Sequence, residues 1–137
     1  MRKLYVCSKP FPDENGELRP RLIGILTELK PGVSPRQNGE YQFEYKLGGT
    51  FPEDIVRLTS FPDINKTYKG FEVMGFMKKW LPSHDFDGLD DILKRAETSF
   101  ENYDEWAVLK TFALSDGQKH AYLYETLPKD VIMYERL

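Results

Sequence analysis

The sequence predicts an α+β fold: a small antiparallel β-sheet, or a partly open barrel, of about five strands, with two or three helices inserted before the last strands. Three observations predict it. The first third alternates β-rich runs with turn residues, the middle carries apolar residues at helical spacing, and the last runs are strand-like again. With 137 residues, 40% of them hydrophobic, we expect one domain, residues 1–137, that builds its own core.

The first strands are predicted from residue type and alternation. "KLYVC" (3–7) is a short β-rich run, and "RLIGILTEL" (21–29) is extended. The interior Gly24 of the second run indicates a bulge or the close approach of another backbone. In "EYQFEY" (40–45) aromatic and polar residues alternate, which is typical of a strand with one buried face.

The connections between these runs are rich in Pro, Gly and Asn. Pro10, Pro12, Asn15, Gly16 and Pro20 predict a loop, because the segment is too rich in proline for a helix. Asn38-Gly39 is the best hairpin-turn signal in the chain. Residues 48–70 are irregular, with a short strand or helical turn in "DIVRLTSF" (54–61) as open alternatives.

Three helices are predicted from apolar spacing and capping signals. The first carries apolar residues at helical spacing from Val73 to Leu81 and ends at about Leu81, before Pro82. The second begins at Asp87 as its N-cap, and the third begins at Asn102. The residues predicted to be buried on these helices are Val73, Met74, Met77, Trp80, Leu81, Leu89, Ile92, Leu93, Ala96, Trp106, Leu109 and Ala113. Strand-like runs at 119–127 and 130–137 complete the chain.

Composition excludes several classes of protein. The single cysteine, Cys7, excludes an internal disulfide framework and suits a reducing compartment. No run approaches the roughly 20 apolar residues of a membrane span, and the N-terminal residues lack the apolar core of a signal peptide. A net charge of −3 gives no general reason to bind a polyanion. We expect a cytoplasmic protein with no membrane association and no direct nucleic-acid binding.

The acidic stretch "DFDGLDD" (85–91) is the first candidate for chemistry. Its acids Asp85, Asp87, Asp90 and Asp91 offer oxygens to a hard cation. An EF-hand loop requires a glutamate six residues after its glycine, whereas Lys94 lies six residues after Gly88. Acidic side chains at the start of a helix also interact favourably with the helix dipole. We therefore interpret this stretch as a helix start in preference to a metal site.

No catalytic, metal or cofactor site emerges from the remaining residues, and we expect no cofactor and no enzyme activity. Ser83, His84 and Asp85 are neighbours in sequence, but catalytic triads are assembled across a fold. Cys7, in a predicted strand, is interpreted as a buried, inert thiol. Two alternatives stay open: a small hydrolase or metal enzyme using the 83–85 cluster, and a nucleic-acid-associated accessory protein. The latter would use a lysine patch of Lys66, Lys69, Lys78 and Lys79.

Several short segments, taken in order, resemble the N-terminal subdomain of HipA-type serine/threonine kinase toxins. They are "LIGILTE", the F-x-Y strand in "YQFEY", the segment "VRLTSFPD" and the aromatic helix "FMKKWLPS" leading to Leu81-Pro82. The family continues Leu-Pro with Glu-Gly, and this chain continues it with Ser83-His84. The resemblance covers most of residues 4–128, and the kinase core of the family has no counterpart in this sequence.

The resemblance implies a free-standing, HipS-like version of the small subdomain, as in split systems whose kinase core is separately encoded. The expected role is non-catalytic: to bind a HipA-like kinase core and restrain or position it, as the antitoxin of a toxin–antitoxin operon. A DNA-binding HipB-like protein is a further candidate member of the complex. Aromatic residues often anchor interfaces, so the predicted partner-binding residues flank or lie in the hinge between the first two helices: Trp80, Ser83, His84, Asp85 and Phe86.

Overall fold

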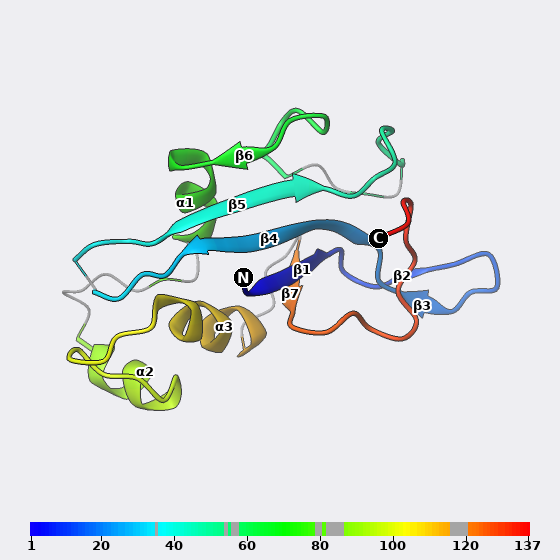
Figure 1. The fold of residues 1–137 in the computed structure, drawn as a ribbon. Helices are drawn as coiled ribbons and strands as arrows, with labels where there is room; N and C mark the ends of the chain where they lie inside the picture. Colours follow the sequence, from blue (N-terminus) through cyan, green and yellow to red (C-terminus); the bar gives the residue numbers. More distant parts are fainter. Residues whose placement is uncertain (35, 54, 56–57, 79–80, 82–86, 116–120) are drawn as a thin grey trace.

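The computed structural model describes residues 1–137 except residues 35, 54, 56–57, 79–80, 82–86 and 116–120. Within the described residues it confirms the α+β class (Figure 1). A five-stranded antiparallel sheet has the order β6-β5-β4-β1-β7, and β2 and β3 form a separate pair. The strands are β1 (Lys3–Cys7), β2 (Phe11–Pro12), β3 (Leu18–Arg19), β4 (Leu22–Lys30), β5 (Glu40–Tyr45), β6 (Tyr68–Lys69) and β7 (Tyr122–Tyr124), and the helices are α1 (Phe71–Met77), α2 (Leu89–Arg95) and α3 (Glu105–Ser115).

The central strand, β4, is buried from Leu22 to Glu28. Gly24 lies where the ring of Phe43 crosses the strand: a Cβ at Gly24 would lie 2.5 Å from the Phe43 ring and 2.5 Å from the carbonyl oxygen of Glu44. The close backbone approach predicted from this glycine is confirmed. Glycine is required here because any side chain would displace the neighbouring strand.

One face of the sheet carries the main core. In β5 the predicted alternation is confirmed, since Tyr41, Phe43 and Tyr45 are buried and the residues between them are partly exposed. Helices α1 and α3 pack against this face: Trp106 stacks on Tyr41 with ring centroids 6.0 Å apart, and Phe76 lies 6.2 Å from Phe43. The buried residues of this core from the other strands and the helices are Leu4, Val6, Ile23, Leu26, Tyr68, Val73, Met77, Leu109 and Leu123.

Aromatic rings fill the part of the core between β5 and α1. Phe61 stacks on Phe43 with centroids 4.3 Å apart, and it contacts Tyr68 at 4.9 Å and Phe76 at 5.0 Å. The Tyr45 hydroxyl donates a hydrogen bond to the Phe61 carbonyl oxygen. Phe61 belongs to the irregular segment before β6, so these contacts tie that segment to the sheet. Much of the aromatic content of the chain is therefore used in the core.

Helix α2 belongs to a smaller hydrophobic cluster of its own. This cluster consists of Leu89, Ile92, Leu93, Ala96, Tyr103 and Val108. Leu81 is half-buried and packs against both this cluster and the main core. The hinge between α1 and α2 is thus connected to the core at Leu81.

The segment between residues 10 and 20, predicted as a loop, contains the β2–β3 hairpin. The Asp13 carboxylate accepts the backbone N–H groups of Asn15 and Glu17 at 2.8 and 2.9 Å, which forms the turn. The buried guanidinium of Arg21 donates to the carbonyl oxygens of Phe11 and Arg19 at 2.9 and 2.6 Å. These side-chain contacts allow β2 and β3 to pair within a proline-rich segment. Local residue preferences in the sequence do not indicate such contacts.

The prediction of a tight hairpin turn at Asn38-Gly39 is wrong. Strand β4 pairs up to Lys30 and β5 begins at Glu40, so the connection spans residues 31–39. Glycine is required at position 39 because the neighbouring backbone leaves no room for a side chain: a Cβ there would lie 2.4 Å from the Lys30 carbonyl oxygen. The hairpin signal therefore marked a close backbone contact beside the strand ends.

The predicted helix starts also need correction. The N-cap of α2 is Gly88, without a side-chain cap hydrogen bond, so Asp87 does not cap it. Helix α3 begins at Glu105, and the preceding Asp104, not Asn102, accepts the Trp106 N–H at 3.2 Å. In the last segment, predicted as a strand, only Ile132 forms a bridge, to Arg21. Of the residues predicted to be buried, Trp80 and the side chain of Ala113 lie outside the described set.

Arg2 joins the sheet to the start of α3. Its guanidinium donates to both oxygens of Glu28 at 2.9 and 2.6 Å and to both oxygens of Asp104 at 2.8 Å. The cation also lies 5.7 Å from the centre of the Trp106 ring. The hydrogen bonds from Arg2 are the main cause that lowers the pKa of the Asp104 carboxyl.

Replacing Arg2 by Ala should destabilise the fold by about 1–3 kcal/mol, because the Glu28 carboxylate would stay buried without its charged donor. The Glu28 side chain is 7% exposed. Urea unfolding at neutral pH measures the change. Lys3→Ala is the control, since the neighbouring Lys3 is exposed at the start of β1 and its substitution should change stability by less than about 0.5 kcal/mol. Equal effects of the two substitutions would contradict the role given to Arg2.

Helix α2 ends in a Schellman motif with an unfavourable residue. Thr98 donates its backbone N–H to Leu93 at 2.9 Å and Glu97 donates to Lys94 at 3.0 Å. This geometry places Glu97 at a positive φ of 58°. Glu97→Gly should therefore raise the free energy of unfolding by about 0.5–1 kcal/mol. Glu101→Gly, at another exposed glutamate, should give no gain, and a loss of stability in Glu97→Gly would refute the prediction.

Candidate interaction surface

The residues predicted to bind a partner lie outside the described residues. Trp80, Ser83, His84, Asp85 and Phe86 are all in this group. The structure therefore does not test the prediction that these hinge residues bind a partner. His120 also lies outside the described set.

Three of the four lysines of the predicted patch are described. Lys66, Lys69 and Lys78 are exposed, whereas Lys79 lies outside the described residues. Lys66 forms a long ion pair with Glu72, with Nζ 3.8 Å from Oε1, and it lies 4.9 Å from the centre of the Tyr68 ring. An acid therefore lies within the patch and partly offsets its charge.

Of the other candidates for chemistry, the structure describes Cys7 and part of the acidic stretch, whereas Ser83, His84 and Asp85 lie outside the described residues. Cys7 is buried, as predicted, and burial raises the pKa of its thiol to about 12, so the thiolate is scarce at neutral pH. Among the described residues, no group of His, Cys, Asp or Glu side chains is arranged to hold a metal ion. None of the helices in the described part of the chain is long and apolar enough to cross a membrane.

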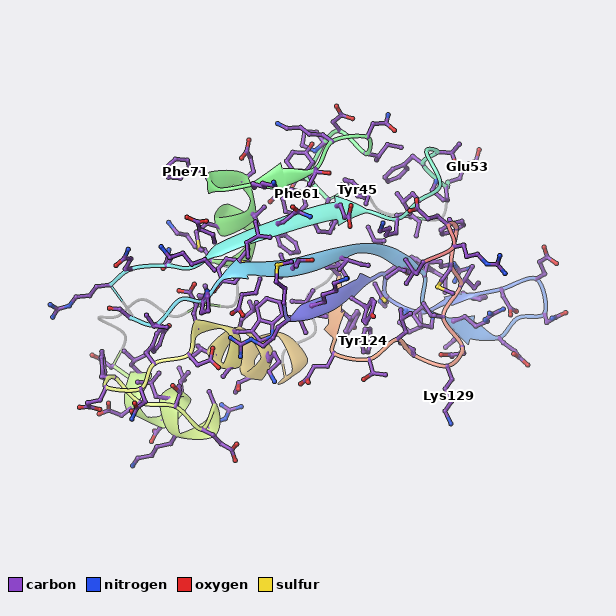
Figure 2. All side chains as sticks on the ribbon, in the orientation of Figure 1. Tyr45, Glu53, Phe61, Phe71, Tyr124 and Lys129 are labelled. Atoms are coloured by element: carbon purple, nitrogen blue, oxygen red, sulfur yellow. The ribbon has the colours of Figure 1, made fainter. Side chains whose placement is uncertain are left out.

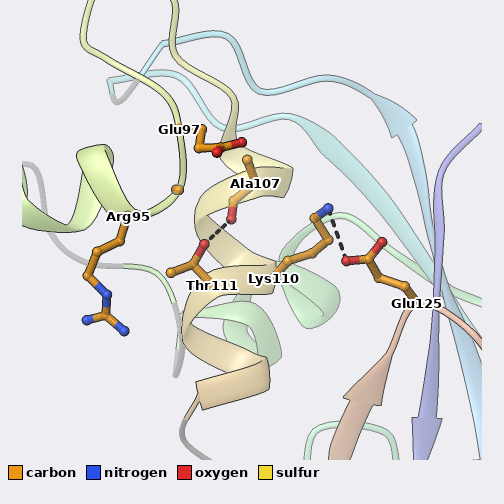
Figure 3. A pocket seen from close by; sticks show the side chains of 7 residues that line it. Arg95, Glu97, Ala107, Lys110, Thr111 and Glu125 are labelled. Atoms are coloured by element: carbon orange, nitrogen blue, oxygen red, sulfur yellow. Dashed lines mark hydrogen bonds and ion pairs between the residues drawn. The ribbon is translucent and has the colours of Figure 1, made fainter.

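Two concave regions are lined in part by polar side chains. In one of them the side chains carry charges of both signs, and in the other the arginines already bind groups of the protein itself. Between α2 and α3, Arg95, Glu97, Lys110 and Glu125 contribute charges of both signs, and Lys110 pairs with Glu125 at 3.2 Å (Figure 3). In the same pocket the Thr111 hydroxyl donates to the carbonyl oxygen of Ala107 at 2.9 Å. A wider cleft of about 740 Å³ lies between the β2–β3 hairpin and residues 131–134. Its arginines bind backbone carbonyl oxygens of the protein itself.

A third concave region is apolar and lies at an edge of the sheet. We call it the Phe71 groove. It has a volume of about 210 Å³ and lies between the start of β5 and the start of α1. It is lined by Asn38, Gly39, Glu40, Tyr41, Gly70, Phe71 and Met74.

The groove forms because the chain leaves the sheet abruptly after β6. Strand β6 pairs with only Gln42 and Phe43 of β5, and Gly70, at a φ of 74°, then turns the chain into α1. A positive φ at this position favours glycine. Phe71, the first residue of α1, is 96% exposed, and Figure 2 shows its ring pointing away from the body of the molecule.

A buried carboxylate fixes the β5 side of the groove. Glu105 is 2% exposed, and its Oε1 accepts the Tyr41 hydroxyl at 2.6 Å and the Gly39 N–H at 3.0 Å. The Glu105 N–H donates to the Gly32 carbonyl oxygen at 2.9 Å. Two residues of the groove, Gly39 and Tyr41, are therefore held by the first turn of α3.

The electrostatic environment of Glu105 disfavours its charged form. Burial is the largest cause that raises its pKa, the charge of Glu28 adds to it, and the hydrogen bonds from Tyr41 and Gly39 oppose it. Burial and the hydrogen bond to Glu105 also raise the pKa of Tyr41, so Tyr41 keeps its proton and stays a donor.

The sequence did not identify Phe71 or Glu105 as a candidate functional residue. A signal for Phe71 was present: at about 100° per residue, it lies roughly opposite the buried stripe of Val73, Phe76 and Met77. A large aromatic residue on the polar side of a helix marks a candidate contact. Nothing in the local sequence of Glu105 indicates that it would be buried against Tyr41.

Comparison of the chain with protein-family models, with curated proteins and with solved structures finds no match. The geometry of the described residues is therefore the basis for the candidate surface.

The raised pKa of Glu105 predicts a pH effect on stability. Between its usual pKa of 4.5 and its raised value in the fold, the unfolded chain loses this proton first, so the contribution of Glu105 to stability falls as pH rises. Glu105→Gln keeps an acceptor for Tyr41 and Gly39 but does not titrate. The stability of the wild type relative to Glu105→Gln should fall from pH 4.5 upward, measured by urea unfolding at a series of pH values. A difference that is constant, or that rises with pH, would overturn the assignment.

Proposed function

We propose that this chain is a non-catalytic protein-binding module that binds a separately encoded HipA-like serine/threonine kinase core and restrains or positions it. In this proposal it acts in the cytoplasm, as the antitoxin of a toxin–antitoxin operon, without a cofactor. A HipB-like DNA-binding protein is a candidate third member of the complex.

The observation that carries the binding role is Phe71. Phe71 is 96% exposed and lines an apolar groove, and a contiguous exposed apolar surface is typical of a protein-binding site. Aromatic residues in such positions are frequent hot spots of interfaces. The kinase as partner rests on the order of motifs from "LIGILTE" to "FMKKWLPS" in the sequence.

Co-expression tests the kinase partner directly. A HipA-like kinase core encoded in the adjacent reading frame should co-purify with this chain, and its toxicity should be relieved by co-expression. If the two proteins form no complex and growth is not restored, the proposal fails. Strong, salt-dependent binding of duplex DNA would instead favour the lysine-patch alternative.

Phe71→Ser should weaken binding of the kinase core about tenfold or more without lowering the stability of the chain, because the side chain makes few contacts within the fold. Phe100→Ser is the matched control, since Phe100 is also exposed and lies before α3. Calorimetric titration and thermal unfolding of both variants measure the two effects. Equal affinities of the two variants would remove Phe71 from the interface.

A further inference from the structure

The Asn38-Gly39 pair lies at the end of the connection between β4 and β5. Asn38 is exposed and Gly39 is half-buried. The Asn38 side chain makes no hydrogen bond with another described residue, so it is free to rotate. An Asn-Gly pair is also a reactive motif. The backbone nitrogen of the glycine can attack the carboxamide of the asparagine, since glycine has no Cβ to block the approach.

A buried carboxyl group accepts the N–H of this glycine. The Gly39 N–H donates to Oε1 of Glu105 at 3.0 Å, and Glu105 is 2% exposed. A base within hydrogen-bond reach of the proton that it removes meets the geometric requirement for general base catalysis. Burial raises the pKa of Glu105, and a carboxylate with a raised pKa is a stronger base than an ordinary one.

The base and the carboxamide approach the Gly39 nitrogen from different directions. The N–H proton lies in the plane of the peptide group, whereas the electron pair that attacks a carbonyl carbon is perpendicular to this plane. Rotation of the Asn38 side chain can therefore bring its Cγ to the nitrogen without displacing Glu105. The base itself is held in place, since the Glu105 N–H donates to the Gly32 carbonyl oxygen at 2.9 Å and Oε1 also accepts the Tyr41 hydroxyl at 2.6 Å.

We propose that Asn38 is a site of spontaneous deamidation at which Glu105 acts as the general base. The Glu105 carboxylate takes the proton of the Gly39 nitrogen as that nitrogen bonds to Cγ of Asn38. The Cγ–Nδ2 bond then breaks, and the leaving nitrogen takes the proton from Glu105 and departs as ammonia. The product is a five-membered succinimide ring, and the carboxylate is regenerated. Water opens the ring to aspartate or isoaspartate.

The product does not fit the space that Gly39 occupies. A Cβ at this position would lie 2.4 Å from the Lys30 carbonyl oxygen and 2.5 Å from the Gly32 nitrogen, so the backbone has little room to shift. Isoaspartate lengthens the backbone by a methylene group, and the succinimide lacks the N–H that binds Glu105. Deamidation should therefore release the connection between β4 and β5 from the first turn of α3.

A second Asn-Gly pair in the chain lacks such a base. Asn15 is also exposed, in the turn of the β2–β3 hairpin, but the Gly16 N–H donates to the Asp13 carbonyl oxygen at 3.0 Å. A backbone carbonyl oxygen accepts a hydrogen bond but does not take up the proton at neutral pH. The Asp13 carboxylate accepts the N–H groups of Asn15 and Glu17 instead. Asn15 is therefore an internal control for an exposed Asn-Gly pair without a base.

The experiment is incubation of the folded chain at neutral pH over several weeks, followed by peptide mass spectrometry. Asn38 should deamidate about tenfold or more faster than Asn15, which is a conservative value for general base catalysis. In the chain unfolded in guanidinium chloride the two rates should be about equal, because Glu105 is no longer positioned. If Asn38 reacts more slowly in the fold than in the unfolded chain, or if Asn15 reacts as fast in the fold, the proposal is overturned.

Two variants separate the base from a structural effect. Glu105→Gln keeps an acceptor for Gly39 and should lower the Asn38 rate to that of Asn15, with the Asn15 rate unchanged. Tyr41→Phe removes the other hydrogen bond to Oε1 and keeps the base, so Asn38 should still react faster than Asn15. An unchanged Asn38 rate in Glu105→Gln would contradict the role of the base. Loss of the fast rate in Tyr41→Phe would do the same, because the effect would then be structural.

The deamidated chain tests the structural consequence. It carries an additional negative charge, so ion exchange separates it from the intact chain. Its isoaspartate form should lose protection of the Gly39 amide against hydrogen exchange. Asn38→Asp is the matched control, since it adds the charge without lengthening the backbone and should keep this protection. Equal protection in the isoaspartate form and in the intact chain would show that the connection is not released.

Discussion

The fold depends on the way the ring of Phe43 lies over Gly24. This contact brings β5 against the central strand and leaves the ring stacked on Phe61. Through Phe61 and Phe76, the irregular segment before β6 and helix α1 join the same core. Since interiors are packed as densely as organic crystals, a methyl group at position 24 would disturb all of these elements together. The position of α1, and with it the Phe71 groove, follows from this packing.

Much of the sheet could be predicted because its strands carry their own signals. Alternation in β5 and the interior glycine of β4 are local patterns with a direct physical cause. The β2–β3 hairpin could not be predicted in this way, because it depends on the Asp13 carboxylate and the Arg21 guanidinium binding backbone groups of the segment. The start of α3 was misplaced for a similar reason: Asp104 also binds Arg2, a residue that lies at the other end of the sequence.

The candidate surface was less predictable than the fold. An exposed aromatic residue is recognised in sequence only when its helical face is known, and Phe71 lies at the first position of α1, where that face is hardest to assign. Glu105 depends on tertiary contacts alone, since Gly32, Gly39 and Tyr41 all belong to the connection or to β5. The interface residues predicted in the hinge came from a family resemblance. They were chosen for residue type and for position between two helices, and physical reasoning from sequence gives no geometry for them.

The pairing of β1 with β7 has a consequence for the order of folding. Tyr5 lies opposite Tyr124, almost the whole length of the chain away. During synthesis β1 can pair with β4 early, but its other edge stays open until β7 has emerged. Long-range pairings of this kind slow folding, and open strand edges invite association with other chains. Until the β1–β7 ladder forms, this edge of β1 is therefore open to association with other chains.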